Sequence, residues 1–239
     1  MATIAILPAR SGSKRIKNKN IIDFCGKPII AYALEAASKS QLFDKIHVST
    51  DSIEINNIVE SSGYPIEFMR PPELSDDNVG TIPVLQWILK EYLSRNQTYE
   101  NVFNIMPPAP LLKPEDLIEA YELYLKHNKK YPLHVVAEFP VPIEWAYRRD
   151  EKGLLEPVKP GAFAIRSQDL DKAFYEAGPF SIFHASHLLR KNPVTPKDAI
   201  SYIMPKERAI DIDDSEDLAL AKKIFLGQQA IKNEKKCQL

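Results

Sequence analysis

The sequence predicts an α/β fold in which a mostly parallel sheet is covered by helices on both faces. Apolar runs bounded by turn residues alternate with segments of helical periodicity along most of the 239 residues, and this alternation is typical of βαβ units. Hydrophobic residues make up 44% of the chain, which is enough to fill the core of one large domain. We therefore expect three layers, and we treat residues 1–239 as a single domain.

The individual elements follow from the two periodicities. Strands are expected at Ile4–Pro8, Lys45–Ser49, Ile66–Phe68, Val102–Met106, Leu133–Glu138, Phe180–Phe183 and Ser201–Met204. Helical faces recur over residues 29–37, 55–59, 84–92 and 117–125, and an amphipathic helix is expected from Ser215 to about Ile231. Asp51, Thr81, Asp214 and Ser215 have the side chains that favour helix N-termini.

The stretch from 140 to 176 breaks this rhythm. It is rich in proline, arginine and aromatic residues, and only two short strands are expected in it, at Trp145–Arg149 and Gly161–Ile165. We interpret it as an inserted arm that lies against a partner subunit or over a binding site.

Composition excludes several classes of protein. Lys and Arg total 31 against 32 Asp and Glu, so the basic excess of a nucleic-acid-binding protein is absent. The two cysteines, Cys25 and Cys237, lack metal-ligand spacing and suit a reducing cytoplasm. No signal peptide is recognised and no apolar run reaches membrane-spanning length, so we expect a cytoplasmic protein that does not bind membranes.

The loop after the first strand carries the clearest chemical signal. Small residues, Ala9, Ser11, Gly12 and Ser13, alternate with the cations Arg10, Lys14, Arg15, Lys17 and Lys19, and Asn20 ends the run. Ligands of α/β sheets bind beyond the carboxyl ends of the strands, and a flexible, cationic, donor-rich loop there suits a polyphosphate. The alternative is an ordinary solvated loop. The sequence is neither a Walker A motif nor a dinucleotide fingerprint.

Asp211 and Asp213 form the second candidate. In an extended segment residues i and i+2 share one face, so their two carboxylates suit Mg²⁺. Capping of the next helix is the alternative, and it fits Asp214, Ser215 and Asp217 better than Asp211.

Other polar segments are weaker candidates. Residues 49–52 and 70–81 each follow an expected strand, and turn and capping chemistry also explains them. Residues 166–178 combine polar and aromatic side chains that would suit a sugar or a subunit contact. His184 and His187 lie three apart, but no third ligand is near in sequence, and an ordinary helix surface is favoured over a metal pair.

Several of these segments, in this order, resemble the acylneuraminate cytidylyltransferase family. The resemblance rests on residues 6–16 with Lys19 and Asn20, residues 48–51, 70–71 and 74–77, and residues 211–213. Residues 167–170 and 174–178 are most similar to the pseudaminic acid members. The resemblance implies a Rossmann-like nucleotidyltransferase fold with an arm that is exchanged in a homodimer, and transfer of CMP from CTP to the anomeric hydroxyl of a nine-carbon 2-keto sugar acid. The activated sugar would serve surface glycan or flagellin glycosylation.

The resemblance also implies roles for particular residues of this chain. The family's nucleotide loop corresponds to Ala9, Arg10, Ser11, Gly12, Ser13, Lys14, Lys19 and Asn20, of which Arg10, Lys14 and Lys19 are the catalytic cations. Its nucleotide pocket corresponds to Arg70, Asp77 and Thr81, and its sugar-reading segment to Gln168, Tyr175 and Glu176. Its Mg²⁺ ligands correspond to Asp211 and Asp213. Asp211 or a water is expected to take the proton of the attacking hydroxyl. Arg15 and Lys17 are expected to be solvated or to face another subunit.

Two departures bear on the sugar. Met106 stands before Pro107 where sialic-acid-activating relatives often carry glutamine, and residues 175–178 replace an arginine-containing segment. We therefore favour pseudaminic acid over legionaminic acid, N-acetylneuraminic acid and the eight-carbon acid of lipopolysaccharide core. A non-catalytic nucleotide-sugar sensor is the alternative from another class, although such a sensor would not need to keep Asp211 and Asp213.

Overall fold

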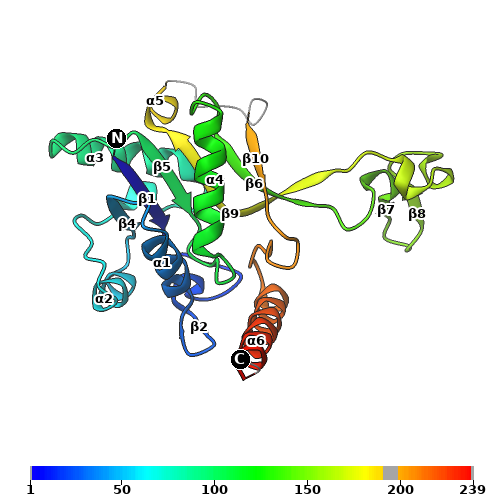
Figure 1. Ribbon diagram of the computed structural model, residues 1–239, viewed down its shortest axis with the longest axis horizontal. Coiled ribbons are helices and arrows are strands. Elements are labelled where there is room, and N and C mark those ends of the chain that lie inside the picture. Colours follow the sequence, from blue (N-terminus) through cyan, green and yellow to red (C-terminus); the bar gives the residue numbers. More distant parts are fainter. Residues whose placement is uncertain (1, 191–198, 238–239) are drawn as a thin grey trace.

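A six-stranded sheet in the order β10-β6-β9-β5-β1-β4 forms the centre of the computed structural model, which describes residues 2–190 and 199–237 (Figure 1). The strands are β1 (Thr3–Pro8), β4 (Lys45–Ser49), β5 (Asn101–Ile105), β6 (Leu133–Glu138), β9 (Phe174–His184) and β10 (Ile200–Ile203). Neighbouring strands are parallel except at β9, which is antiparallel to both β5 and β6. The predicted mostly parallel sheet is therefore confirmed.

Helices cover both faces of this sheet. They are α1 (Ile29–Ser40), α2 (Ile53–Ser61), α3 (Thr81–Ser94), α4 (Pro114–Lys126), α5 (Ala185–Leu188) and α6 (Ser215–Cys237). Side chains of β1 alternate between two cores: Ala5 and Leu7 pack with α1 and α4, whereas Ile4 and Ile6 pack with α3. This alternation produces the three expected layers.

Residues 139–173 leave the sheet between β6 and β9 and project far from it as an arm (Figure 1). The arm holds a small antiparallel pair, β7 (Tyr147–Arg149) and β8 (Leu155–Pro157), with short 3₁₀ turns at Ile143–Trp145, Ala162–Ala164 and Ser167–Asp169. The ring of Phe163 stacks on Tyr147 at 4.6 Å and on Trp145 at 6.3 Å. The tip therefore has only a small aromatic core of its own.

The structure corrects several local expectations. Ile66–Phe68 forms no strand, because Ile66 and Phe68 pack against the two different cores instead of pairing at the sheet edge. The strand expected at Gly161–Ile165 is also absent, because Ala162–Ala164 forms a 3₁₀ turn. The second strand of the arm is β8, which pairs with β7.

Three expected helix boundaries also change. Ser52, and not Asp51, accepts the capping hydrogen bond of α2 from the Ile55 amide, and Gly80, and not Thr81, is the N-cap of α3. At the start of α6, Asp214, one of the two expected capping residues, accepts the amides of Glu216 and Asp217. The last helix, expected to end near Ile231, continues to Cys237.

Helix α6 joins the body through a third core. Phe225 packs edge-to-face on Phe24, which lies in the β2–β3 hairpin (Asp23–Phe24 and Lys27–Pro28), and on Tyr32 of α1. Ile212 is fully buried in the same cluster. Within the described residues, no helix is long and apolar enough to cross a membrane.

Candidate active site

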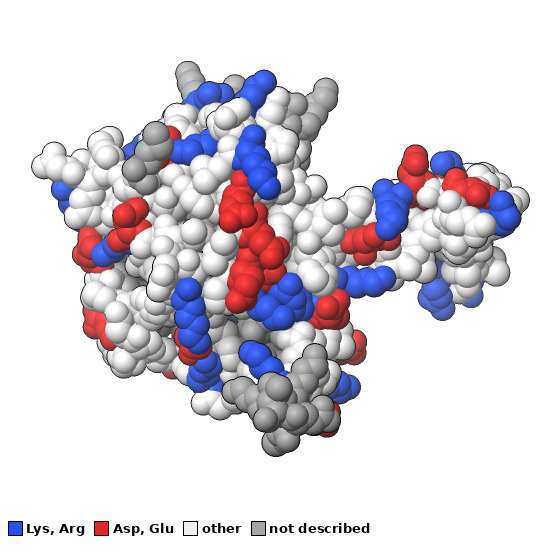
Figure 2. Space-filling view, viewed as in Figure 1, with Lys and Arg blue, Asp and Glu red and all other residues white. Residues whose placement is uncertain are grey.

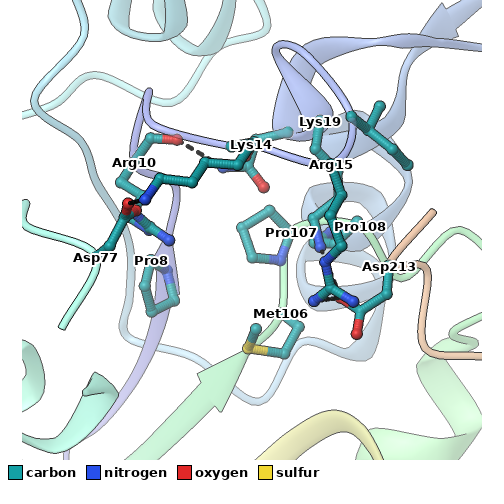
Figure 3. Close-up of a pocket in the computed structure, with 13 residues that line it drawn as sticks. Pro8, Arg10, Lys14, Arg15, Lys19, Asp77, Met106, Pro107, Pro108 and Asp213 are labelled. Atoms are coloured by element: carbon teal, nitrogen blue, oxygen red, sulfur yellow. Dashed lines mark hydrogen bonds and ion pairs between the residues drawn. The ribbon is translucent and has the colours of Figure 1, made fainter. Parts of the chain in front are cut away.

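A cleft of about 440 Å³ opens at the carboxyl ends of β1 and β5 (Figure 3). Four segments line it: the loop after β1, Asp77, the residues after β5 and the segment before α6. The lining residues are Pro8, Arg10, Ser13, Lys14, Arg15, Ile16, Lys19, Asn20, Asp77, Met106, Pro107, Pro108 and Asp213. The two strongest signals in the sequence, the cationic loop and the Asp211–Asp213 segment, thus meet at one edge of the sheet, where ligands of α/β proteins bind.

The loop is held by hydrogen bonds to its neighbours. The Ala9 amide donates to the Ser49 carbonyl at 2.8 Å, and Asn20 Nδ2 donates to the Arg10 carbonyl at 2.9 Å. Gly12 lies so close to Arg10 that a Cβ there would stand 3.3 Å from Nη1. The two hydrogen bonds fix the loop's ends, and a larger residue at position 12 would press on Arg10.

Two carboxylates divide the cations of the cleft between them. Arg10 and Lys14 point toward Asp77, whereas Arg15 points toward Asp213, and Met106 and Pro107 lie between the two groups (Figure 3). Hydrogen bonds from Arg10 and Lys14 hold the pKa of Asp77 below its usual value. Asp77 therefore stays ionised and keeps both cations at the mouth of the cleft.

On the other side, Asp213 Oδ1 lies 2.9 Å from Arg15 Nη2 and 3.3 Å from Lys19 Nζ. Lys19 Nζ also donates to the Ile212 carbonyl at 2.8 Å. Lys19 thus ties the cationic loop to a segment almost two hundred residues away. Arg15, expected to be solvated or to face a subunit, is exposed and also lines the cleft.

Asp211 lies beside this group, against β9. Its Oδ2 is 3.9 Å from the place that a Cβ on Gly178 would occupy, and Gly178 has a φ of +72° that favours glycine. Partial desolvation of the carboxyl group and the neighbouring charge of Asp213 raise the pKa of Asp211. Its carboxylate accepts no hydrogen bond from the residues described.

The chemistry of this acidic pair fits Mg²⁺. Two hard carboxylate oxygens on one edge of a cleft, one of them without a hydrogen-bond donor, suit a cation that binds a few carboxylates and completes its shell with phosphate and water. Among the residues described, no group of three or more His, Cys, Asp and Glu could hold a metal by itself. The pair therefore fits an ion shared with a phosphate substrate.

Other expected site residues lie outside the cleft lining. Arg70 is 5% exposed, and its guanidinium donates to the Ser49 carbonyl at 2.6 Å and to Ser49 Oγ at 3.0 Å. Burial lowers the pKa of Arg70 to about 10. Thr81 begins α3. In this structure Arg70 therefore braces the end of β4 beneath the loop.

The residues expected to read a sugar lie on the arm and its neck. Tyr175 packs against Phe139 at 5.1 Å, and Glu176 Oε1 lies 3.4 Å from His134 Nδ1. Gln168 lines a separate 260 Å³ pocket in the arm. The structure does not bring these three side chains to the cleft within one chain.

The paired histidines do not form a helix surface. His184 ends β9 and bonds Ser186 and Glu100, while His187 lies within α5. Asp51, which belongs to a polar segment expected either to line this sheet edge or to cap the next helix, holds the loop through Ser11. Its position after the strand adjacent to β1 was the signal for that role.

Comparisons with known proteins agree with this site. A cytidylyltransferase family model matches residues 4–159. The chain is 35% identical over 225 residues to a pseudaminic acid cytidylyltransferase of Campylobacter jejuni, covering 94% of this chain and 97% of the relative. It is 31% identical to an N-acylneuraminate cytidylyltransferase of Escherichia coli, covering 99% of this chain and 54% of that protein.

The fold agrees as well. The solved structure of CMP:2-keto-3-deoxy-manno-octonic acid synthetase in complex with CTP superimposes with a TM-score of 0.72 at 13% identity, covering 95% of this chain and all of that one. The Rossmann-like nucleotidyltransferase fold expected from the sequence is thereby confirmed. The chain belongs to the cytidylyltransferase family and is a nucleotidyltransferase enzyme.

Proposed function

We propose that the enzyme transfers CMP from CTP to the anomeric hydroxyl of a nonulosonic acid, releases pyrophosphate and prefers pseudaminic acid. One observation carries the proposal: Arg10, Lys14, Arg15 and Lys19 converge on a single cleft that Asp213 closes from the far end of the chain. The name of the Campylobacter jejuni relative, which matches over nearly its whole length, supports the choice of sugar.

The cations act on the triphosphate. Arg10 and Lys14 are paired with Asp77 in the free enzyme, and on binding of CTP they exchange this carboxylate for phosphate oxygens. As the anomeric oxygen attacks the α-phosphorus, negative charge builds on the phosphoryl group and on the leaving pyrophosphate. Lys19, fixed by the Ile212 carbonyl, is already placed to neutralise it.

Asp211 and Asp213 would hold the Mg²⁺ ion. When bound, the ion supplies charge neutralisation for the phosphate oxygens. Arg15 and Lys19 hold Asp213 in place. An ion bound to Asp213 would therefore have a fixed position, and so would the phosphate that shares this ion.

The sugar site is proposed to need a second copy of the chain. Gln168 lies on the arm, which projects away from the body (Figure 2), and Tyr175 and Glu176 lie at the start of β9, where the arm rejoins the sheet. The arm exposes Leu154, Leu155 and Val158 at 68%, 58% and 51%, and much of its visible surface is uncharged (Figure 2). We therefore propose a homodimer in which the arm packs on the partner subunit. A cytoplasmic location suits the free thiol of Cys25.

The test is pyrophosphate release with CTP and Mg²⁺ against a panel of pseudaminic, legionaminic, N-acetylneuraminic and 3-deoxy-manno-octulosonic acids. We expect kcat/KM for pseudaminic acid to exceed the others by at least about tenfold, as for sites that discriminate by pocket contacts. A preference for N-acetylneuraminic acid would favour the function named for the Escherichia coli relative. Release with none of them would favour a non-catalytic nucleotide-sugar sensor.

A further inference from the structure

The segment that carries Asp211 and Asp213 has no regular secondary structure to hold it. It runs from the end of β10 at Ile203 to the start of α6 at Ser215. Its own backbone hydrogen bonds are mainly local turn bonds. The Arg208 amide donates to the Pro205 carbonyl at 2.8 Å, and the Ala209 amide donates to the Lys206 carbonyl at 3.3 Å. A site that must hold two carboxylates in register therefore needs side chains to fix this segment.

Arg208 is the strongest of these side chains. Its Nη1 and Nη2 both donate to Asp116 of α4, the Nη2 bond to Oδ1 being 2.8 Å. The two side chains are only 9% and 2% exposed. A guanidinium paired in this bidentate way fixes direction as well as distance, which a lysine cannot do.

The carboxylate that receives Arg208 is itself held rigidly. Asp116 Oδ2 accepts the Lys113 amide at 2.9 Å at the start of α4, and Asp116 Oδ1 accepts the hydroxyl of Tyr202 at 3.0 Å. Tyr202 lies on β10, so one carboxylate joins α4, β10 and the segment after β10. Arg208 is therefore anchored to the body of the fold and not to another loop.

The anchor lies close enough to the site to set its geometry. Asp211 follows Arg208 by three positions, a reach of at most about 10 Å in extended chain. Between the two acids Ile212 is fully buried, with Phe24 and Ile29 in the same cluster. With Arg208 fixed behind it and Ile212 fixed between the acids, the segment has little freedom to withdraw Asp211 and Asp213 from the cleft.

We infer that Arg208 is a positioning residue that, through Asp116, holds Asp211 and Asp213 at the edge of the cleft where a divalent cation binds. This inference rests on the proposed function for its metal, but its test does not need turnover. Arg208 is not among the residues that line the cleft, and both terminal nitrogens of its guanidinium are paired with Asp116, so its role is to position the acids.

The experiment measures Mn²⁺ binding to the full chain by electron paramagnetic resonance in the presence of CTP and without a sugar acid, against the same titration without protein, beside the Mg²⁺ dependence of pyrophosphate release. For Arg208→Gln we expect at least about tenfold weaker Mn²⁺ binding and a similar rise in half-saturating Mg²⁺, with KM for CTP changed less than about threefold. Arg208→Lys, which keeps the charge but loses the bidentate pairing, should fall between. Tyr202→Phe, which keeps the Arg208–Asp116 pair but removes one hydrogen bond to Asp116, should stay closer to wild type than either Arg208 variant.

Lys129→Gln is the matched control. Lys129 Nζ lies 3.1 Å from Glu100 Oε1. Glu100 precedes β5 at the amino end of that strand, whereas Asp211 and Asp213 lie at the carboxyl ends of the strands. The variant therefore loses an ion pair that does not contact the segment before α6. It should melt at a lower temperature and bind Mn²⁺ as wild type does. The inference is overturned if Arg208→Gln also binds Mn²⁺ normally, or if the wild type binds none. If Arg208→Gln does not fold, a wild-type Mn²⁺ affinity in Arg208→Lys overturns it equally.

The two proposals fail in different ways. Wild-type protein that binds Mn²⁺ but releases no pyrophosphate with any acid would refute the proposed function. The comparison of Mn²⁺ affinities would still decide the role of Arg208.

Discussion

The carboxylate of Asp51 accepts two hydrogen bonds from Ser11, one from the backbone amide at 2.9 Å and one from Oγ at 2.8 Å. Asp51 follows β4 and Ser11 follows β1, so this contact joins the ends of two adjacent parallel strands. It holds the first part of a cationic loop whose ends are fixed by Ala9 and Asn20. The loop is therefore braced before a triphosphate arrives.

Asp51→Ala should weaken CTP binding by loosening the loop. Loss of two hydrogen bonds to a charged group predicts a rise in KM for CTP of about fivefold or more, with a smaller change in kcat. Steady-state kinetics of pyrophosphate release measures this. Ser11→Ala, which keeps the amide bond and loses only the hydroxyl, should show a smaller rise, and equal effects of the two variants would contradict the bracing role.

Lys19→Ala should lower turnover or CTP affinity at least about tenfold, the scale expected when one charge-assisted hydrogen bond is removed from a site. The reason is that Lys19 both faces the cleft and fixes the Ile212 carbonyl between the two acids. Lys17→Ala is the control, because Lys17 is exposed and does not line the cleft. If both variants have the same kinetic constants as wild type, Lys19 plays no part in the reaction.

The sequence was sufficient to predict most of the sheet and the place of the cationic loop at its edge, because both rest on local signals, whereas the roles of the loop and of the acidic pair stay predictions. β6 lies at its expected residues, and Lys19 and Asp213 meet because both follow strands at one edge of the sheet. Local signals could not separate Arg15 from Lys17, since the direction of each side chain depends on a turn in which Asn18 adopts a φ of 53°.

Contacts between residues far apart in the sequence could not be predicted for the same reason. Arg208 and Asp116 are separated by 92 positions, and neither residue lies in a recognisable motif. Phe68 was mistaken for part of a strand because an apolar alternation of three residues does not reveal whether it pairs in a sheet or packs beneath a helix. Its ring lies against His47, Trp87 and Tyr92.

Asp211→Ala should abolish pyrophosphate release while leaving the protein folded. Asp211 offers an oxygen with no hydrogen-bond donor among the described residues and sits beside Asp213, so its loss removes half of the proposed Mg²⁺ ligands. Asp214→Ala is matched in charge and position, but it removes only the cap of α6. It should lower thermal stability and retain Mg²⁺-dependent turnover. Near-normal release by Asp211→Ala with added Mg²⁺ would remove Asp211 from the metal site.

Leu155→Glu should weaken the proposed dimer at least about tenfold, because it places a charge on an apolar arm surface that the chain leaves 58% exposed. Sedimentation velocity over a range of concentrations measures the dissociation. Leu93→Glu is the control, since Leu93 is 56% exposed on α3, far from the arm. A wild-type protein that sediments as a monomer at all concentrations would contradict the proposed dimer directly.

His47 should make the protein less stable as the pH falls. The side chain is 2% exposed on β4, its Nδ1 lies 2.9 Å from the Tyr92 hydroxyl, and Nε2 has no partner among the described residues. Burial, with the nearby charges of Lys45 and Arg70, lowers the pKa of His47 from 6.5 to about 3. The imidazole is thus neutral in the folded state and protonates more readily in the unfolded one.

Because the folded pKa is the lower one, this stabilising contribution is fully present above about pH 6.5 and is lost progressively as the pH falls toward about 3. Between pH 7 and pH 5 the linkage amounts to roughly 2 kcal/mol of the free energy of unfolding. Urea unfolding at the two pH values should therefore show a smaller loss for His47→Gln than for wild type. His127→Gln, which replaces an exposed histidine, should behave as wild type does. An equal loss in wild type and His47→Gln would mean that His47 is not the buried neutral group responsible for the acid sensitivity.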